Sequence, residues 1–141
     1  MVYWDTSALV SLYVPDIHSA AAAKALTGHS AAILFTGLHE LELTNAIALR
    51  VFRREITPLA ARQSLAALAS DRRQGLFVDA HWPESCFATA GRLAERTTSR
   101  LGCRSLDLLH VAAALELQAT GFLTFDKRQR SLARAGGLSA A

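Results

Sequence analysis

The chain has 141 residues, of which 51% are hydrophobic and only 19% are charged. Fifteen Lys and Arg against 12 Asp and Glu give a net charge of +3. This length suits one domain, 1–141, and the apolar fraction excludes a disordered chain. No apolar stretch reaches the roughly 18 residues of a membrane span, and the first residues have no basic segment of a secretory signal. We therefore expect a soluble, cytoplasmic protein.

The first half of the chain alternates short apolar runs with helical patterns. A β-prone run over 2–4 ends at Asp5, and the hydroxyls of Thr6 and Ser7 are candidate caps for a helix that Pro15 stops. An alanine-rich helix is predicted next, followed by a buried strand and a second helix. These three elements are predicted over 17–26, 31–36 and 38–54.

The second half repeats this alternation. Thr57 and Pro58 are typical of a helix start, and Ser105 is the expected cap of a strongly apolar helix. The predicted helices cover 58–73, 83–100, 106–119 and 127–135, and the predicted strands cover 76–78 and 122–125, with a very short last strand at 136–138.

Strands separated by helical stretches indicate parallel pairing, and continuous apolar strands indicate a sheet that is covered on both faces. The sequence thus predicts the α/β class. We expect an α/β/α sandwich in which a parallel sheet of four to five strands has helices on both faces.

Two acidic residues are placed where predicted strands end. Asp5 follows the first strand and Asp126 follows the strand over 122–125. Ligands of open parallel sheets bind beyond the carboxyl ends of the strands, so both side chains would face that crevice. An aspartate after a strand can also simply cap the next helix, and this alternative remains open for both.

Two further acids lie in helices with little polar surface. Asp107 is in the first turn of the helix over 106–119, which is apolar nearly all round. Glu42 shares a face with Asn45 three residues later, in a stripe that continues through Leu49 and Phe52. A carboxylate in such surroundings needs a partner.

Four carboxylates in apolar surroundings cannot all ionise unaided, because desolvation and mutual repulsion raise their pKa values. Basic side chains or a bound cation could compensate. Mg²⁺ prefers oxygen ligands and stabilises the charge of phosphoryl displacement. Carboxylates in a basic chain therefore point to metal-dependent phosphodiester hydrolysis.

The chain resembles the PIN-domain nucleases, and among them the VapC-type toxins of toxin–antitoxin pairs. The resemblance runs over essentially the whole chain. It rests on four blocks in order, namely 3–9 (YWDTSAL), 42–47 (ELTNAI), 105–114 (SLDLLHVAAA) and 121–129 (GFLTFDKRQ).

The resemblance implies a PIN fold and an endoribonuclease that depends on Mg²⁺ or Mn²⁺. Matched residue by residue, it assigns the catalytic and metal-binding acids to Asp5, Glu42, Asp107 and Asp126. It assigns supporting roles to Ser7 and Thr124, and Asn45 is added because it shares the face of Glu42. It also implies a homodimer and a VapB-like antitoxin as partner. The chain departs from the family at its C-terminus, where the usual last strand is short or missing.

Several basic residues flank these acids in the sequence. Arg104, Lys127 and Arg128 could hold RNA phosphates or could form a solvated basic face.

The five histidines show no clustering in the sequence, and we expect His110 to be a packed or hydrogen-bonded histidine rather than a ligand. Two other functions remain open: a non-catalytic PIN-fold interaction module and a small-molecule phosphatase.

Overall fold

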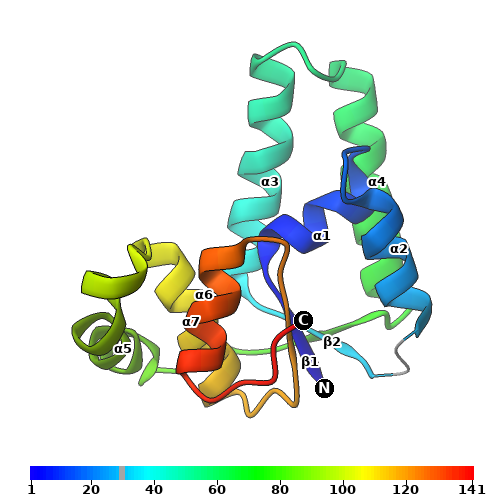
Figure 1. Ribbon diagram of the computed structural model, residues 1–141. Helices are drawn as coiled ribbons and strands as arrows, with labels where there is room; N and C mark the ends of the chain where they lie inside the picture. Colours follow the sequence, from blue (N-terminus) through cyan, green and yellow to red (C-terminus); the bar gives the residue numbers. More distant parts are fainter. Residues whose placement is uncertain (29–30) are drawn as a thin grey trace.

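The protein is described by a computed structural model that covers residues 1–28 and 31–141 (Figure 1). Strands and pairs of helices alternate along it as the sequence predicts. The strands are β1 (Val2–Trp4), β2 (Ile33–Phe35), β3 (Phe77–Asp79) and β4 (Phe122–Leu123). The helices are α1 (Thr6–Tyr13), α2 (Ser19–Gly28), α3 (Gly37–Phe52), α4 (Pro58–Arg73), α5 (Cys86–Leu101), α6 (Ser105–Glu116) and α7 (Lys127–Ala135). None of these helices is both long and apolar enough to cross a membrane.

The four strands form one parallel sheet in the order β3-β2-β1-β4. Tyr3 pairs with Leu34 on one side and with Phe122 on the other, so β1 is an inner strand. The expected α/β class and parallel sheet are confirmed. Because all strands run the same way, their carboxyl ends meet at one edge, and Asp5 lies at that edge on an inner strand.

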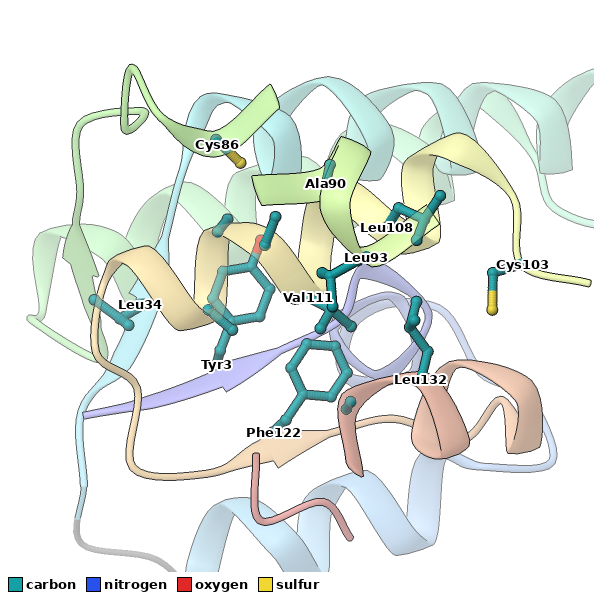
Figure 2. Packing of buried hydrophobic residues seen from close by; sticks show 14 residues of the cluster. Tyr3, Leu34, Cys86, Ala90, Leu93, Cys103, Leu108, Val111, Phe122 and Leu132 are labelled. Atoms are coloured by element: carbon teal, nitrogen blue, oxygen red, sulfur yellow. The ribbon is translucent and has the colours of Figure 1, made fainter. Parts of the chain in front are cut away.

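Alternate residues of the strands face opposite layers of helices, which gives the α/β/α sandwich (Figure 1). Tyr3, Leu34 and Phe122 pack with residues of α5, α6 and α7, and the rings of Tyr3 and Phe122 are stacked 5.6 Å apart (Figure 2). Trp4 and Phe35 pack with residues of α1 to α4. Both faces are buried, which explains why the strands are continuous apolar runs.

The caps of α1 and α6 differ from the prediction. The side chain of Asp5, not a hydroxyl of Thr6 or Ser7, accepts the Ala8 N–H at the start of α1. Helix α6 begins at Ser105 itself, with Arg104 as the capping position. At α1 the carboxylate is the better acceptor for a free N–H of the first turn. At α6 the Asp107 carboxylate instead accepts the N–H of the capping residue Arg104.

The last strand is reduced to a single bridge, in line with the short or missing strand expected at the C-terminus, and it does not begin at 136–138. Gly136 and Gly137 end α7, and Gly137 has a φ of 96°. The chain pairs with β4 only afterwards, through one parallel bridge between Phe122 and Ala140. The sheet edge is thus covered by the last three residues, since Phe122 N–H donates to Ser139 O and Ala141 N–H donates to Phe122 O.

Candidate active site

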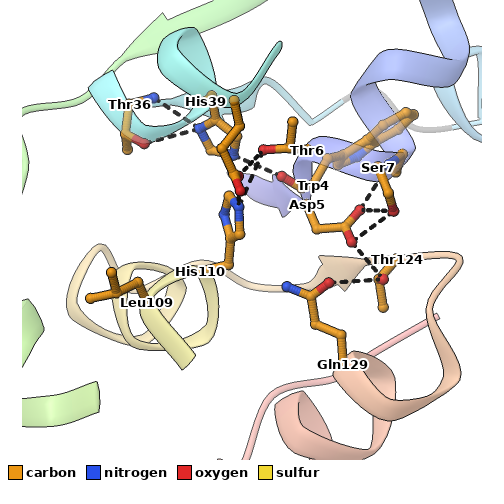
Figure 3. Close-up of polar contacts among 12 residues, drawn as sticks. Trp4, Asp5, Thr6, Ser7, Thr36, His39, Leu109, His110, Thr124 and Gln129 are labelled. Atoms are coloured by element: carbon orange, nitrogen blue, oxygen red, sulfur yellow. Dashed lines mark hydrogen bonds and ion pairs between the residues drawn. The ribbon is translucent and has the colours of Figure 1, made fainter. Parts of the chain in front are cut away.

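Asp5 is the most buried acid of the site, with 1% of its surface exposed. Its backbone N–H donates to Leu123 O, which ties the end of β1 to the end of β4. Its carboxylate accepts hydrogen bonds from Ala8 N–H at 2.8 Å and from the hydroxyls of Ser7 and Thr124 at 2.8 Å (Figure 3). These donors fix the orientation of the carboxylate without neutralising it.

Burial dominates the electrostatics of Asp5. Desolvation raises its pKa, and the hydrogen bonds from Ala8, Thr124 and Ser7 offset only part of the rise. Asp5 forms no ion pair with any residue in the described ranges. An ionised Asp5 is therefore a buried negative charge that, in the described part of the chain, is compensated by hydrogen bonds and to a smaller extent by the charge of His110, but not by an ion pair.

Glu42 reaches the same region from α3 and is half-buried. Its Oε2 accepts a hydrogen bond from the Thr6 hydroxyl at 2.6 Å and another from His110 Nε2. Burial by itself would raise the pKa of Glu42, but His110 and Thr6 outweigh it and hold the pKa below its usual value. Glu42 is thus stabilised in its ionised form by the protein itself.

Two of the five histidines do meet in the structure, although the sequence shows no clustering. The rings of His39 and His110 are 5.3 Å apart, and both pack against Tyr3. His39 Nε2 donates to Trp4 O at 2.8 Å, and its Nδ1 accepts the Thr36 N–H at 3.0 Å. As expected, His110 is a packed, hydrogen-bonded histidine, but one of its partners is a site acid.

Asp107 and Asp126 each lie at the start of a helix. Asp107 Oδ2 accepts Arg104 N–H at 3.0 Å, and Asp126 Oδ1 accepts the N–H groups of Arg128 and Gln129. The helix-capping alternative therefore holds for Asp126, as it does for Asp5, whereas Asp107 accepts the N–H of the capping residue of α6. Only one oxygen of Asp107 and of Asp126 is used in this way, and in the described part of the chain the other has no hydrogen-bond donor.

Two residues connect these acids. The Thr124 hydroxyl donates to Asp5 Oδ2 and accepts Asp126 N–H at 3.0 Å, so it bridges the two strand ends. The buried Cys103 thiol lies near both Asp107 and Asp126. Burial raises the pKa of this thiol, and the charges of the two acids raise it further. Three acids thus lie at one edge of the sheet, because α1, α6 and α7 all start there.

A groove of about 560 Å³ lies beside these acids. Ser7, Glu42 and Asn45 line it together with the apolar side chains of Ala46 and Leu49. The stripe predicted on this helix is therefore a groove wall rather than a core face, and Phe52 at its end is 83% exposed. The core face of α3 is formed by His39, Leu43 and Ile47.

The model of the PIN domain family matches residues 2–135. The chain belongs to this family. Three solved structures share the fold of this PIN domain at low sequence identity, and a search of curated proteins returned no match.

The first similar structure is VapC20 from Mycobacterium tuberculosis, described as a sarcin-ricin loop cleaving toxin. It is 18% identical, with a TM-score of 0.70, and the match covers 96% of this chain and 95% of that chain. FitAcB from Neisseria gonorrhoeae is 15% identical, with a TM-score of 0.69 and coverage of 99% and 96%. VapBC2 from Rickettsia felis, bound to a DNA fragment from their promoter, is 16% identical, with a TM-score of 0.66 and coverage of 100% and 98%.

The donor atoms of the PIN domain site suit a hard divalent cation. Asp107 and Asp126 each have a carboxylate oxygen left over from capping, and Asp5 is a buried carboxylate whose bonds from Ala8, Thr124 and Ser7 offset only part of its desolvation. Oxygen ligands of this kind are preferred by Mg²⁺ and Mn²⁺. Within 1–28 and 31–141, no three His, Cys, Asp or Glu side chains already stand in a metal-binding cluster, so the acids are neighbours rather than a closed cage.

The remaining candidates are on the surface of the PIN domain. Arg104, Lys127 and Arg128 are exposed at the starts of α6 and α7, beside the acids that cap these helices. Asn45 is exposed on the groove wall.

Sequence reasoning missed Thr6 and His110 as partners of Glu42. His110 carried one available signal, its position one helical turn after Asp107. Asp16, which lies in a predicted loop with no sign of a special role, is half-buried on the groove wall and accepts a hydrogen bond from Ser11.

Proposed function

We propose that this PIN domain is a divalent-metal-dependent endoribonuclease that acts as the toxin of a toxin–antitoxin pair. The observation that carries the proposal is Asp5, a buried carboxylate with no ion-pair partner among the described residues, joined through the Thr124 hydroxyl to the turn that bears Asp126. The family membership and the description of VapC20 as a sarcin-ricin loop cleaving toxin support it.

The site acids would hold Mg²⁺ or Mn²⁺ through Asp5, Asp107, Asp126 and Glu42. The bound cation supplies charge stabilisation for an in-line attack on a phosphodiester and lowers the pKa of water. Ser7 and Thr124 keep the Asp5 carboxylate turned in one direction, and the exposed Arg104, Lys127 and Arg128 would bind RNA phosphates.

A VapB-like antitoxin would occupy the groove, and a second copy of the chain would complete a homodimer. Large apolar side chains are exposed on or beside α3, including Leu41 at 67% and Phe52 at 83%. Several exposed large apolar side chains on one helix are a feature of a surface that a partner protein covers. The comparison with VapBC2, a pair bound to promoter DNA, supports an antitoxin partner.

The test is cleavage of a structured RNA by the purified chain with Mg²⁺ or Mn²⁺, compared with Asp5→Asn and with Glu95→Gln. Glu95 is an exposed acid of α5 and serves as the matched control. We expect wild type and Glu95→Gln to cleave and Asp5→Asn to lose cleavage. Equal cleavage by Asp5→Asn would refute the assignment.

A second measurement separates the alternatives. Divalent ions should raise the melting temperature of wild type but not of Asp107→Asn. Absence of both cleavage and metal stabilisation would favour a non-catalytic interaction module. Phosphate release from nucleotides without RNA cleavage would favour a small-molecule phosphatase.

A further inference from the structure

His110 is a nearly fully buried histidine, 3% exposed, in direct contact with an acid of the site. Its Nδ1 lies 2.9 Å from the Tyr3 hydroxyl. Its Nε2 lies 3.2 Å from the Thr6 hydroxyl (Figure 3) and also contacts Glu42 Oε2. An ionised carboxylate can only accept hydrogen bonds, so Nε2 must carry the proton of this contact.

These contacts involve only one of the two carboxylate oxygens of Glu42. Oε2 receives both donors, the imidazole N–H of His110 and the hydroxyl of Thr6. Oε1 has no donor from any described residue, and Glu42 lines the groove next to Ser7 and Asn45. The protein thus occupies one oxygen and leaves the other for whatever enters the groove.

The ring of His110 is itself held rigidly. The Tyr3 hydroxyl that contacts it belongs to an inner strand and is completely buried, and its ring packs against Phe122 and His39. Burial raises the pKa of Tyr3, so the hydroxyl keeps its proton. His39 is fixed in turn by its bond to Trp4 O, so the support of Glu42 reaches back into the sheet.

We propose that His110 is a positioning residue for phosphodiester hydrolysis: with Thr6 it occupies Glu42 Oε2, so that Glu42 presents Oε1 alone to the metal and substrate. This inference rests on the proposed nuclease function. Side chains that orient metal-binding groups typically contribute about 10–100-fold in activity or metal affinity. A carboxylate without these donors would rotate among several positions and present either oxygen.

The experiment compares His110→Leu, which removes the donor, with His110→Gln, whose side-chain amide can donate from nearly the position of Nε2. We expect His110→Leu to lower kcat about 10–100-fold with little change in KM, and to weaken Mn²⁺ binding, measured as the Mn²⁺ concentration that gives half of the full thermal stabilisation. His110→Gln should restore most of both quantities. His81→Leu, at an exposed histidine, is the matched control and should leave both unchanged.

A further variant covers the case in which His110→Leu does not fold. Thr6→Val removes the second donor to Oε2 with little change in shape, and it too should lower kcat without raising KM. A merely structural role would make His110→Gln as defective as His110→Leu, or would lower the melting temperature of both with wild-type kcat for the folded protein. Either result overturns the inference.

The outcome also separates this inference from the proposed function. If wild type cleaves RNA, Asp5→Asn does not, and folded His110→Leu and Thr6→Val cleave at the wild-type rate, only the positioning role is wrong. If wild type cleaves no RNA, the proposed function and the inference both fail.

Discussion

At the residue scale, the site acids serve two purposes at once. Asp5, Asp107 and Asp126 each accept a backbone N–H at the start of a helix. A cap of this kind stabilises a helix by about 1 kcal/mol and explains why an aspartate is tolerated there. Capping does not account for the burial of Asp5, because an exposed cap would serve α1 equally well.

The burial of Asp5 leads to a prediction about stability. Its raised pKa means that the folded protein favours the protonated form, so the free energy of unfolding falls as pH rises from the ordinary value of 3.8 through the folded pKa. Asparagine does not ionise, so Asp5→Asn avoids this fall in the free energy of unfolding. We expect a melting temperature a few degrees higher at pH 7 without divalent ions, at about 4 °C per kcal/mol for a chain of this size.

Calorimetry at pH 7 and at pH 3 measures this effect. The advantage of Asp5→Asn should shrink at the lower pH, where Asp5 is protonated in both states. A variant that melts below wild type at pH 7 would contradict the reasoning. The exposed Glu95→Gln should show no such gain.

The buried His39 should make the free energy of unfolding change with pH in the opposite direction. Burial, and to a smaller extent the charge of His110, lower its pKa from 6.5 to about 3. The neutral ring is also the form that accepts Thr36 N–H. The unfolded chain therefore takes up the proton first, and the free energy of unfolding should fall by up to about 1.4 kcal/mol per pH unit as pH decreases below about 6.5.

Urea unfolding of wild type and His39→Gln between pH 6.5 and pH 5 tests this dependence. Glutamine can accept the Thr36 N–H as in a capping box, but it does not titrate. The free energy of unfolding should therefore change less with pH in the variant than in wild type. Equal slopes would place the pH dependence elsewhere.

At the element scale, the chain order of helices and strands was predictable, whereas their ends were less so. Helix α7 is found at its predicted bounds of 127–135, while the strand predicted over 31–36 is reduced to Ile33–Phe35. Strand length depends on the partner, and β3 offers only three residues for pairing. Local composition carries no information about that partner.

The end of α5 provides a test of one such boundary. Gly102 follows the helix with a φ of 63°, a left-handed conformation that costs other residues about 1–2 kcal/mol. A Cβ at Gly102 would meet no atom within 4 Å, so the loss in Gly102→Ala should come from the backbone alone. We expect about 1 kcal/mol lower stability in urea unfolding.

Gly91 in the same helix is the matched control. It also has open space for a Cβ, but no positive φ. Gly91→Ala should therefore stabilise the protein by about 0.5–1 kcal/mol through helix propensity. The strain argument fails if both substitutions change stability in the same direction.

At the scale of the whole molecule, two helical layers on a parallel sheet place three helix starts at one edge. The exposed basic residues at the starts of α6 and α7 adjoin this edge. The net charge of +3 is modest, so RNA binding must depend on where the charges lie rather than on their sum.

Salt dependence of RNA binding tests the placement of these charges. Each phosphate contact that is lost should lower the slope of log Kd against log salt concentration by about 1. In an Asp5→Asn background, which prevents cleavage, Arg128→Gln should show this reduction. Arg62→Gln, an exposed arginine of α4, should not, and equal slopes for both variants would remove Arg128 from the RNA-binding surface.

The sequence by itself determined the α/β class, the parallel sheet and the position of each acid relative to its own element. These features follow from local patterns, because burial of both sheet faces makes strands apolar and helix starts select acidic residues.

Only the tertiary structure decided which side chains meet. Tyr3 and His110 are 107 residues apart, and Asp5 and Thr124 are 119 apart, yet each pair is within hydrogen-bond distance. These contacts depend on β4 pairing beside β1 and on α3 and α6 converging at the sheet edge. Periodicity identifies the buried face of an element but not the element that covers it, so the partner of Glu42 emerged only from the packed fold.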